Sequence, residues 1–123
     1  MGLSVAQAVR ELDIEVSIKW PNDVVVSRKK ICGILTEMGL EKGRIREVVI
    51  GDGINVNLEE FPDELKDKAT SLYLETGKKY DRNRLISLIM EKFERNYEKF
   101  TETCDLSPLI DDYNVMLANR NQP

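Results

Sequence analysis

Hydrophobic and polar positions change their period along the chain, and these changes predict the order of its elements. Between Leu3 and Leu12, apolar residues recur at helical spacing, which predicts an amphipathic helix. The segment EVSIKW then alternates, with Val16, Ile18 and Trp20 on one face. This period of two predicts a strand, and we expect Trp20 to pack beneath the turn that follows.

Three further strands are predicted before the helical part of the chain. Pro21 ends the first strand because proline has no N–H to donate, and residues 24–26 form a short apolar run. The polar turn SRKK leads into ICGILTEM, which predicts a hairpin. After a second turn, EKGR at 41–44, apolar residues alternate with Asn as far as Leu58. We therefore expect a half-buried last strand in an antiparallel meander.

The second half of the chain is predicted to be helical. FPDELKDK is typical of a loop with one helical turn, and Gly77 supplies a stop signal after TSLYLET. Asp81 is a suitable N-cap for a long helix, and Pro108 suits the first turn of a last one. Strands followed by long helices indicate an α+β domain. The apolar stripe of the long helix, which we expect to lie in the core, consists of Leu85, Ile89, Phe93, Tyr97 and Phe100.

Size and charge limit the class of protein. The 123 residues are enough for one domain or part of one, and 41% hydrophobic with 33% charged residues is typical of a soluble globular chain. A net charge of −4 argues against nucleic acid as the main partner, because phosphate neutralisation needs a basic face. The sequence contains no apolar run of membrane-spanning length and no signal peptide. We expect a cytoplasmic protein that does not bind membranes.

Histidine is absent from the sequence, which excludes a His-based triad and an HExxH zinc site. Chemistry must therefore come from lysine, arginine, carboxylates, amides or the backbone, a set suited to stabilising a polyanion. Cys32 and Cys104 lie far apart without a CxxC motif, and we expect both to be reduced, buried thiols. The carboxylates show no spacing typical of a metal site, so we predict none; those considered are Glu37, Asp52, Glu59 and Glu60.

Two clusters carry candidate chemistry. In the first, Lys19, Asn22, Asp23 and Lys30 surround a short strand, so a turn can bring both lysines to the mouth of one site. Lysine is a compact point charge that can bind a carboxylate or a phosphate. The alternative is a capped turn with solvated charges.

The second cluster is the pair of glycines in GDGIN, residues 51–55. Glycines inside a strand mark a bulge or a close approach of a ligand, and Gly33 in the preceding strand adds a third such position. Val56 stands where a dinucleotide fingerprint has its third glycine, and no P-loop is present. An ordinary kinked strand is the alternative.

In this order, the segments KWPND, KICGILTE and GDGINVN resemble three linked motifs of the biotin protein ligase (biotin–[acetyl-CoA carboxylase] ligase) catalytic domain. The resemblance covers nearly the whole chain, including the helical part in outline. It implies a mixed, largely antiparallel sheet packed with helices. It also implies an ATP-dependent reaction, in which biotin's carboxylate attacks the α-phosphate to give biotinyl-5′-adenylate. A lysine of the biotin carboxyl carrier protein then accepts the biotin.

The resemblance also assigns roles to residues. Lys30 matches the family's lysine between the biotin carboxylate and the α-phosphate, and Lys19 would be a second phosphate cation. Asn22 and Asp23 match the turn on the phosphate side, and Asn55 matches a contact toward adenine. Biotin and the adenylate would lie over the glycine positions Gly33, Gly51 and Gly53. Family enzymes use Mg²⁺ with ATP and often form homodimers.

The sequence also departs from the family. The G-R-G-R-x-G-R biotinoyl loop and the segment before it are absent, and NRNQP stops where the family enters a small β-barrel. We therefore expect residues 1–123 to form the central and C-terminal part of one catalytic domain, incomplete as an enzyme on its own. Asp52 replaces a small apolar residue between the two glycines and would weaken anion binding unless it points away. Two alternatives remain: a remnant used for dimerisation or weak ligand binding, and a lipoate-ligase-like protein.

Overall fold

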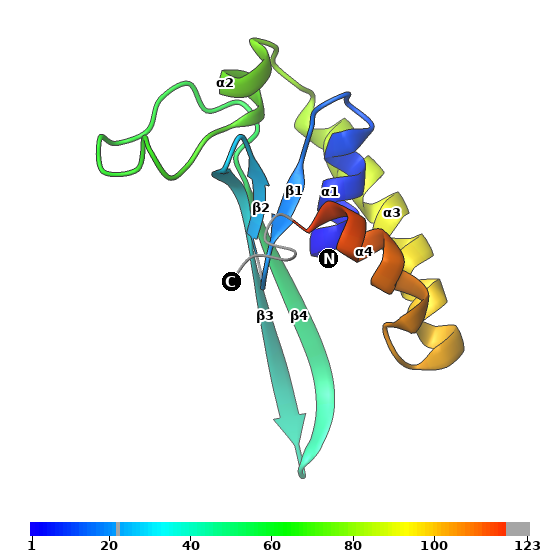
Figure 1. Cartoon of the computed structure of the whole chain (residues 1–123). Helices are drawn as coiled ribbons and strands as arrows, with labels where there is room; N and C mark the ends of the chain where they lie inside the picture. Colours follow the sequence, from blue (N-terminus) through cyan, green and yellow to red (C-terminus); the bar gives the residue numbers. More distant parts are fainter. Residues whose placement is uncertain (22, 118–123) are drawn as a thin grey trace, which may run out of the picture.

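The chain folds into a four-stranded sheet with helices beside one of its faces (Figure 1). The computed structural model describes residues 1–21 and 23–117, apart from the side chain of Arg46. Neighbouring strands are antiparallel and follow one another in the sheet in chain order. The strands are β1 (Ser17–Lys19), β2 (Asp23–Val26), β3 (Lys29–Glu41) and β4 (Arg44–Ile54). The predicted meander is therefore confirmed.

Two tight turns set the register of the sheet. Ser27 and Arg28 connect β2 to β3 with φ angles of 53° and 67°, and Lys42 and Gly43 connect β3 to β4 with 54° and 77°. Two successive positive φ angles give a turn whose twist matches that of the flanking strands. Both predicted turns are confirmed. The β3–β4 hairpin extends well beyond the helices (Figure 1).

Two parallel bridges make the sheet mixed. Leu117 pairs with Ile18 of β1, and Ala69 pairs with Lys30 of β3. The first brings the last described residue of the chain back to the edge of the sheet. The second places the loop after β4 beside the start of β3, and it matters for the site described below.

The core lies between the sheet and the helices. α1 (Gly2–Arg10) packs against the sheet and against α3 (Arg82–Thr103). Side chains of α1, of β1 to β3 and of the N-terminal half of α3 are buried together, as is Leu72 at the start of α2 (Leu72–Thr76). Burying a large aliphatic side chain contributes about 1.5–3 kcal/mol. α4 (Ile110–Met116) closes the layer with the buried Met116.

The predicted helix ends are confirmed. Gly77 follows α2 in the left-handed conformation, at a φ of 74°. The Asp81 carboxylate accepts hydrogen bonds from the N–H groups of Asn83 and Arg84 at the start of α3. Pro108 lies in the short helix η1 (Ser107–Leu109) that leads into α4. No helix within the described residues is long and apolar enough to cross a membrane.

The predicted core stripe of α3 was wrong in its second half. Leu85 and Ile89 are buried, but Tyr97 is 55% exposed. Steps of four residues advance about 40° beyond a full turn, so the stripe drifts away from the core. Phe93 and Tyr97 instead stack along the outside of α3 with ring centroids 5.8 Å apart, and Phe100 is tilted against Tyr97 at 6.2 Å.

A polar residue occupies the core side of α3 at that level. Asn96 is 7% exposed, and its amide donates hydrogen bonds to Ser4 Oγ at 3.0 Å and to Gln7 Oε1 at 2.9 Å. Both acceptors belong to α1. Because a buried amide is costly when unpaired, these bonds fix α3 against α1 at one register.

Three further expectations were wrong. Trp20 is 64% exposed, because β1 ends at Lys19 and the indole does not pack beneath the turn. β4 ends at Ile54 rather than Leu58, since the backbone oxygens of residues 55 and 56 accept hydrogen bonds from the start of α2. Cys104 follows α3 in a left-handed conformation and is exposed, whereas Cys32 is buried as expected and both thiols are free.

Candidate functional site

One row of paired positions crosses the whole sheet. Lys19 pairs with Asp23, Asp23 pairs with Gly33, and Gly33 pairs with Gly53. Directly paired residues in a sheet point to the same face. The neighbours of this row in sequence, Ile18, Val24 and Cys32, belong to the core. The row therefore lies on the face that is turned away from the helices.

A β-bulge brings Lys30 onto this face. The register shifts between Val24, which pairs with Cys32, and Val25, which pairs with Lys30, so Ile31 has no partner in the ladder. In a regular strand, residues three apart such as Lys30 and Gly33 point to opposite faces. The extra residue of a bulge resets that alternation, so Lys30 shares the face of Gly33.

The side chain of Lys30 lies beside two residues of this row, Asp23 and Gly33. Its Nζ is 3.2 Å from Asp23 Oδ1. A Cβ added to Gly33 would lie 2.9 Å from both Cε and Nζ of Lys30. Gly33 therefore leaves the space in which the lysine side chain lies. The ion pair is half-exposed, so its main effect is to orient the ammonium group rather than to stabilise the fold.

Gly51 and Gly53 extend the surface beside Lys30. Neither has a positive φ angle, so their backbone conformation does not require glycine. An added Cβ would have its nearest neighbour 3.8 Å away at Gly51 and 4.0 Å away at Gly53, in both cases a backbone oxygen of β3. A side chain would fit there. Glycine weakens a strand, and what it provides here is backbone open to close approach by another molecule.

These residues form a shallow cleft, called the glycine cleft below. Its volume is about 510 Å³. Charged groups lie at one end, and Leu35, which is 63% exposed and pairs with Gly51, lies at the other. The cleft can accept an elongated molecule with an apolar part and an anionic end. Its lining consists of Asp23, Lys30, Gly33, Ile34, Leu35, Gly51, Asp52 and Gly53.

Asp52 points away from the glycine face. It pairs with Ile34, and neighbours along a strand alternate between faces. Ile34 approaches Gly2 at the start of α1, so this is the helix side of the sheet. Burial raises the pKa of the Asp52 carboxyl, and the ammonium group of Met1 opposes that shift. The orientation of Asp52 answers the question left open by the sequence.

Cys32 lies next to the cleft but is not a nucleophile. Burial raises the pKa of its thiol to about 12, and the negative charge of Asp52 adds to the shift. Lys30 acts in the opposite direction and is outweighed. The thiol is therefore protonated at neutral pH, and thiols react as thiolates.

The other candidate residues lie in different places. Lys19 is exposed in the same row but does not line the glycine cleft. Asn55 is also outside the cleft, and its amide donates a hydrogen bond to the Thr70 carbonyl at 3.3 Å. Asn22 lies outside the described residues.

Lys29 and Lys30 belong to different cavities. Lys29 lines a second opening of about 760 Å³, together with the loop after β4, Thr70 and Glu75. The lysine of the glycine cleft is Lys30. No group of three or more potential metal-ligating side chains lies together in the part of the chain that the structure describes.

Sequence reasoning missed Leu35, Thr70 and Glu75. Leu35 lies inside the ICGILTE motif, but the sequence indicated no role for it. Thr70 and Glu75 line the second opening, and the bridge between Lys30 and Ala69 brings their part of the chain beside β3. No local sequence pattern reveals a contact between segments so far apart.

The open face of the sheet carries Lys30 over Gly33, with Gly51 and Gly53 in the same cleft, an arrangement that can accept an anionic ligand. Comparison with known proteins identifies the class of protein. A model of the biotin/lipoate A/B protein ligase family matches residues 1–55. The chain belongs to this family, and its fold is that of the biotin protein ligases.

Individual relatives agree. The bifunctional ligase/repressor BirA of Bacillus subtilis is 48% identical over 102 residues, which are 80% of this chain and 31% of that protein. The biotin–[acetyl-CoA-carboxylase] ligase of Mycobacterium tuberculosis is 38% identical over 98 residues, covering 76% of this chain and 34% of the relative.

A solved structure of biotin protein ligase from Aquifex aeolicus, in complex with biotin and ATP, superposes with a TM-score of 0.83 at 38% identity. The match covers 95% of this chain and 48% of that one. The chain thus spans about a third of its curated relatives and about half of this solved one.

Proposed function

We propose that this chain forms the central and C-terminal part of the catalytic domain of a biotin protein ligase. The enzyme would attach biotin to a carrier-protein lysine at the expense of ATP. The observation that carries the proposal is the position of Lys30, whose ammonium group lies over Gly33 in the cleft floored by Gly51 and Gly53. The relative solved with biotin and ATP supports the choice of ligands.

The first step joins two anions. A carboxylate oxygen of biotin attacks the α-phosphorus of ATP, and the bond from that phosphorus to the oxygen bridging to the β-phosphate breaks. Biotinyl-5′-adenylate and pyrophosphate result. The ammonium group of Lys30 would lie between carboxylate and phosphate and offset their repulsion as charge builds up. Asp23 would hold that group in place.

The remaining predicted residues have supporting roles in the proposal. Lys19 would approach the phosphates from the end of β1, and Asn22 would contact them from the turn. Biotin would lie along Gly33, Gly51 and Gly53 with its apolar part toward Leu35. Asn55 would contribute at the adenine end, and its hydrogen bond to the Thr70 carbonyl supports a role in shaping the loop after β4.

The second step transfers biotin to protein. The amine of a lysine on the biotin carboxyl carrier protein attacks the acyl carbon of the adenylate, and AMP leaves. A cytoplasmic location and a homodimer are part of the proposal. Mg²⁺ would arrive bound to the phosphates of ATP, because the described residues form no metal site of their own. The arginine-rich loop would come from residues outside the printed sequence.

A chimera tests the function. This chain would replace the matching segment of the Bacillus subtilis relative, and transfer of biotin to a carrier protein would be measured with ATP present. We expect biotinylation that depends on ATP. Because the family model includes lipoate ligases, lipoate is offered in parallel. Transfer of lipoate in preference to biotin, or of neither acid, would contradict the proposal.

A further inference from the structure

The main chain of Lys30 is held by a segment that returns from the loop after β4. The Lys30 N–H donates to the Lys68 carbonyl at 2.9 Å, and the Thr70 N–H donates to the Lys30 carbonyl at 2.9 Å. Both backbone groups of Lys30 on that side are therefore occupied by one segment, residues 68–70. Because the bulge lies immediately after Lys30, the pairing of β3 with β2 is irregular at this point. The returning segment is thus an important restraint on this residue.

The segment takes the place that β4 leaves. β4 ends at Ile54, opposite Cys32, and the Asn55 N–H makes the next hydrogen bond, to the Ile31 carbonyl at 2.7 Å. The chain then leaves the sheet and returns at Ala69 beside Lys30. The side-chain amide of Asn55, just after β4, donates a hydrogen bond to the Thr70 carbonyl and so connects the end of β4 to the returning segment.

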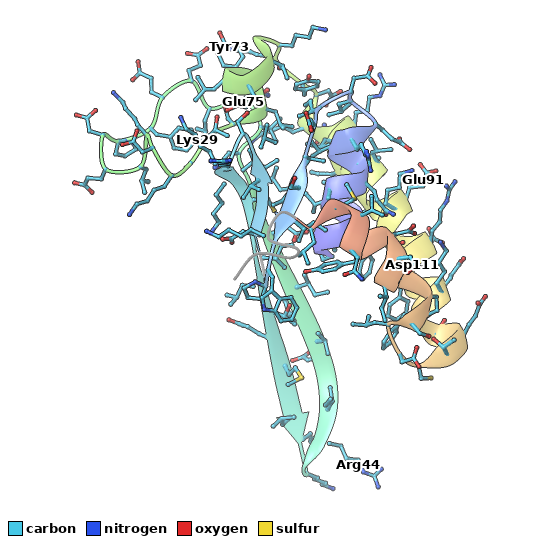
Figure 2. All side chains as sticks on the ribbon, viewed as in Figure 1. Lys29, Arg44, Tyr73, Glu75, Glu91 and Asp111 are labelled. Carbon is cyan, nitrogen blue, oxygen red and sulfur yellow. The ribbon has the colours of Figure 1, made fainter. Side chains whose placement is uncertain are left out.

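The carboxylate of Glu75, on α2, holds the returning segment against the β2–β3 turn. One of its oxygens accepts a hydrogen bond from Thr70 Oγ1 at 2.7 Å, and the other accepts one from Ser27 Oγ at 3.2 Å. Thr70 is 2% exposed and belongs to the returning segment, whereas Ser27 belongs to the β2–β3 turn. Figure 2 shows Glu75 on α2, above the start of β3, from which Lys29 projects. The carboxylate therefore bridges the two segments that flank the start of β3.

Glu75 is not the N-cap residue of its own helix. Ser71 performs that function, since its hydroxyl accepts the Leu74 N–H at 3.1 Å. The Glu75 carboxylate accepts hydrogen bonds from two side chains outside α2, those of Ser27 and Thr70. A residue whose task was helix formation alone would not need these two partners.

We propose that Glu75 is a positioning residue for Lys30. Its carboxylate fixes Thr70 against the β2–β3 turn, Thr70 and Lys68 fix the main chain of Lys30, and the ammonium group is thereby held over the glycine cleft. The role in catalysis rests on the proposed function, but the mechanical link does not. Catalysis by an aimed charge loses rate when the charge is free to move, even where binding is kept.

The first test measures the mechanical link in the 123-residue chain. Hydrogen exchange of the Lys30 amide is followed by NMR in Glu75→Ala, Glu75→Gln and Glu60→Ala. Because hydrogen bonds to a charged group are stronger than those between neutral groups, Glu75→Ala should speed exchange at Lys30 about tenfold or more. Glutamine keeps an acceptor oxygen and should restore most of the protection. Glu60 lines the same cavity and is the matched control, with no change expected.

The second test measures catalysis in the chimera with the same three variants. Glu75→Ala should lower kcat about tenfold with little change in the KM for biotin, and Glu75→Gln should recover most of the rate. Unchanged exchange at Lys30 in Glu75→Ala would overturn the link. Faster exchange with an unaltered kcat would overturn the role in catalysis. A chimera that is inactive before mutation would count against the proposed function and leave the exchange result standing.

If Glu75→Ala does not fold, Ser27→Ala replaces it. This change removes one of the two partners on an exposed turn. It should raise exchange at Lys30 by a smaller factor than loss of both bonds, and no increase at all would again overturn the link.

Discussion

Lys30 Nζ lies 3.2 Å from Asp23 Oδ1, although the two residues come from different strands and Lys30 would face away from Gly33 in a regular strand. The bulge at Ile31 makes this pair possible. The site thus depends on an irregularity of the sheet as much as on the residues themselves. An ammonium group with a carboxylate on one side and bare backbone beneath it is suited to bind a second anion above.

The glycine floor can be tested by filling it. Gly51→Val places a branched side chain on the open face, where the nearest atom to its Cβ would be 3.8 Å away. Valine also favours strands. We expect unchanged or slightly higher thermal stability with loss of biotin binding, measured by calorimetry on the chimera. A variant that is equally stable and binds biotin normally would show that the ligand lies elsewhere.

Asp52 provides the complementary test on the opposite face. Because its side chain lies on the helix side of the sheet, Asp52→Ala should leave the dissociation constants for biotin and ATP unchanged within about twofold, that is, within about 0.4 kcal/mol. Calorimetry with each ligand in turn measures both constants. Clearly tighter ATP binding in the variant would mean that the carboxylate reaches the glycine cleft.

Two large side chains of α3 should differ in their contribution to stability. Ile89 is 4% exposed and packs in the core, so Ile89→Ala should cost about 2–5 kcal/mol. Phe93 is half-buried on the outer stack, so Phe93→Ala should cost about 1 kcal/mol. Urea unfolding of the two variants gives the comparison. Equal losses would place Phe93 in the core, as the sequence had predicted.

The raised pKa of the Cys32 thiol predicts that the stability of the fold decreases at alkaline pH. Folding raises the pKa of its thiol from 9.0 to about 12, so above pH 9 the unfolded chain releases a proton that the folded chain keeps. Stability from this group is complete below pH 9 and is lost as the pH rises toward 12. The free energy of unfolding should fall by up to about 1.4 kcal/mol per pH unit more than in Cys32→Ala. Parallel slopes for the two proteins would contradict the shift.

Much of the fold could be predicted because its signals are local. The turns at Ser27 and Lys42, the cap at Asp81 and the stop at Gly77 each depend on a few neighbouring residues, and all are present. The incorrect predictions concern features that depend on small angular errors summed along a helix, or on residues distant in sequence. Drift of a four-residue repeat moved Tyr97 out of the core. A competing set of hydrogen bonds from α2 ended β4 before Leu58.

The sequence predicted which residues form the site, but not how the fold positions them. The motifs indicated Lys30 and the three glycines, and the structure brings all four into one cleft. Nothing in the order of residues reveals that Ile31 is left out of the ladder, which decides the face of Lys30. Nor does it reveal that Glu75 bridges Thr70 and Ser27. Both features arise when segments far apart in the chain are packed together.

The most direct measurement compares the neighbouring lysines in the chimera. Lys30→Ala should reduce biotin-dependent exchange of pyrophosphate into ATP by about a hundredfold to a thousandfold, comparable with the loss of a strong electrostatic contact to a transition state. Lys29→Ala, which alters the other cavity, should retain most of the rate, and circular dichroism should show both variants folded. Near-normal exchange in Lys30→Ala, or an equal loss in both variants, would contradict the assignment of the active-site cation.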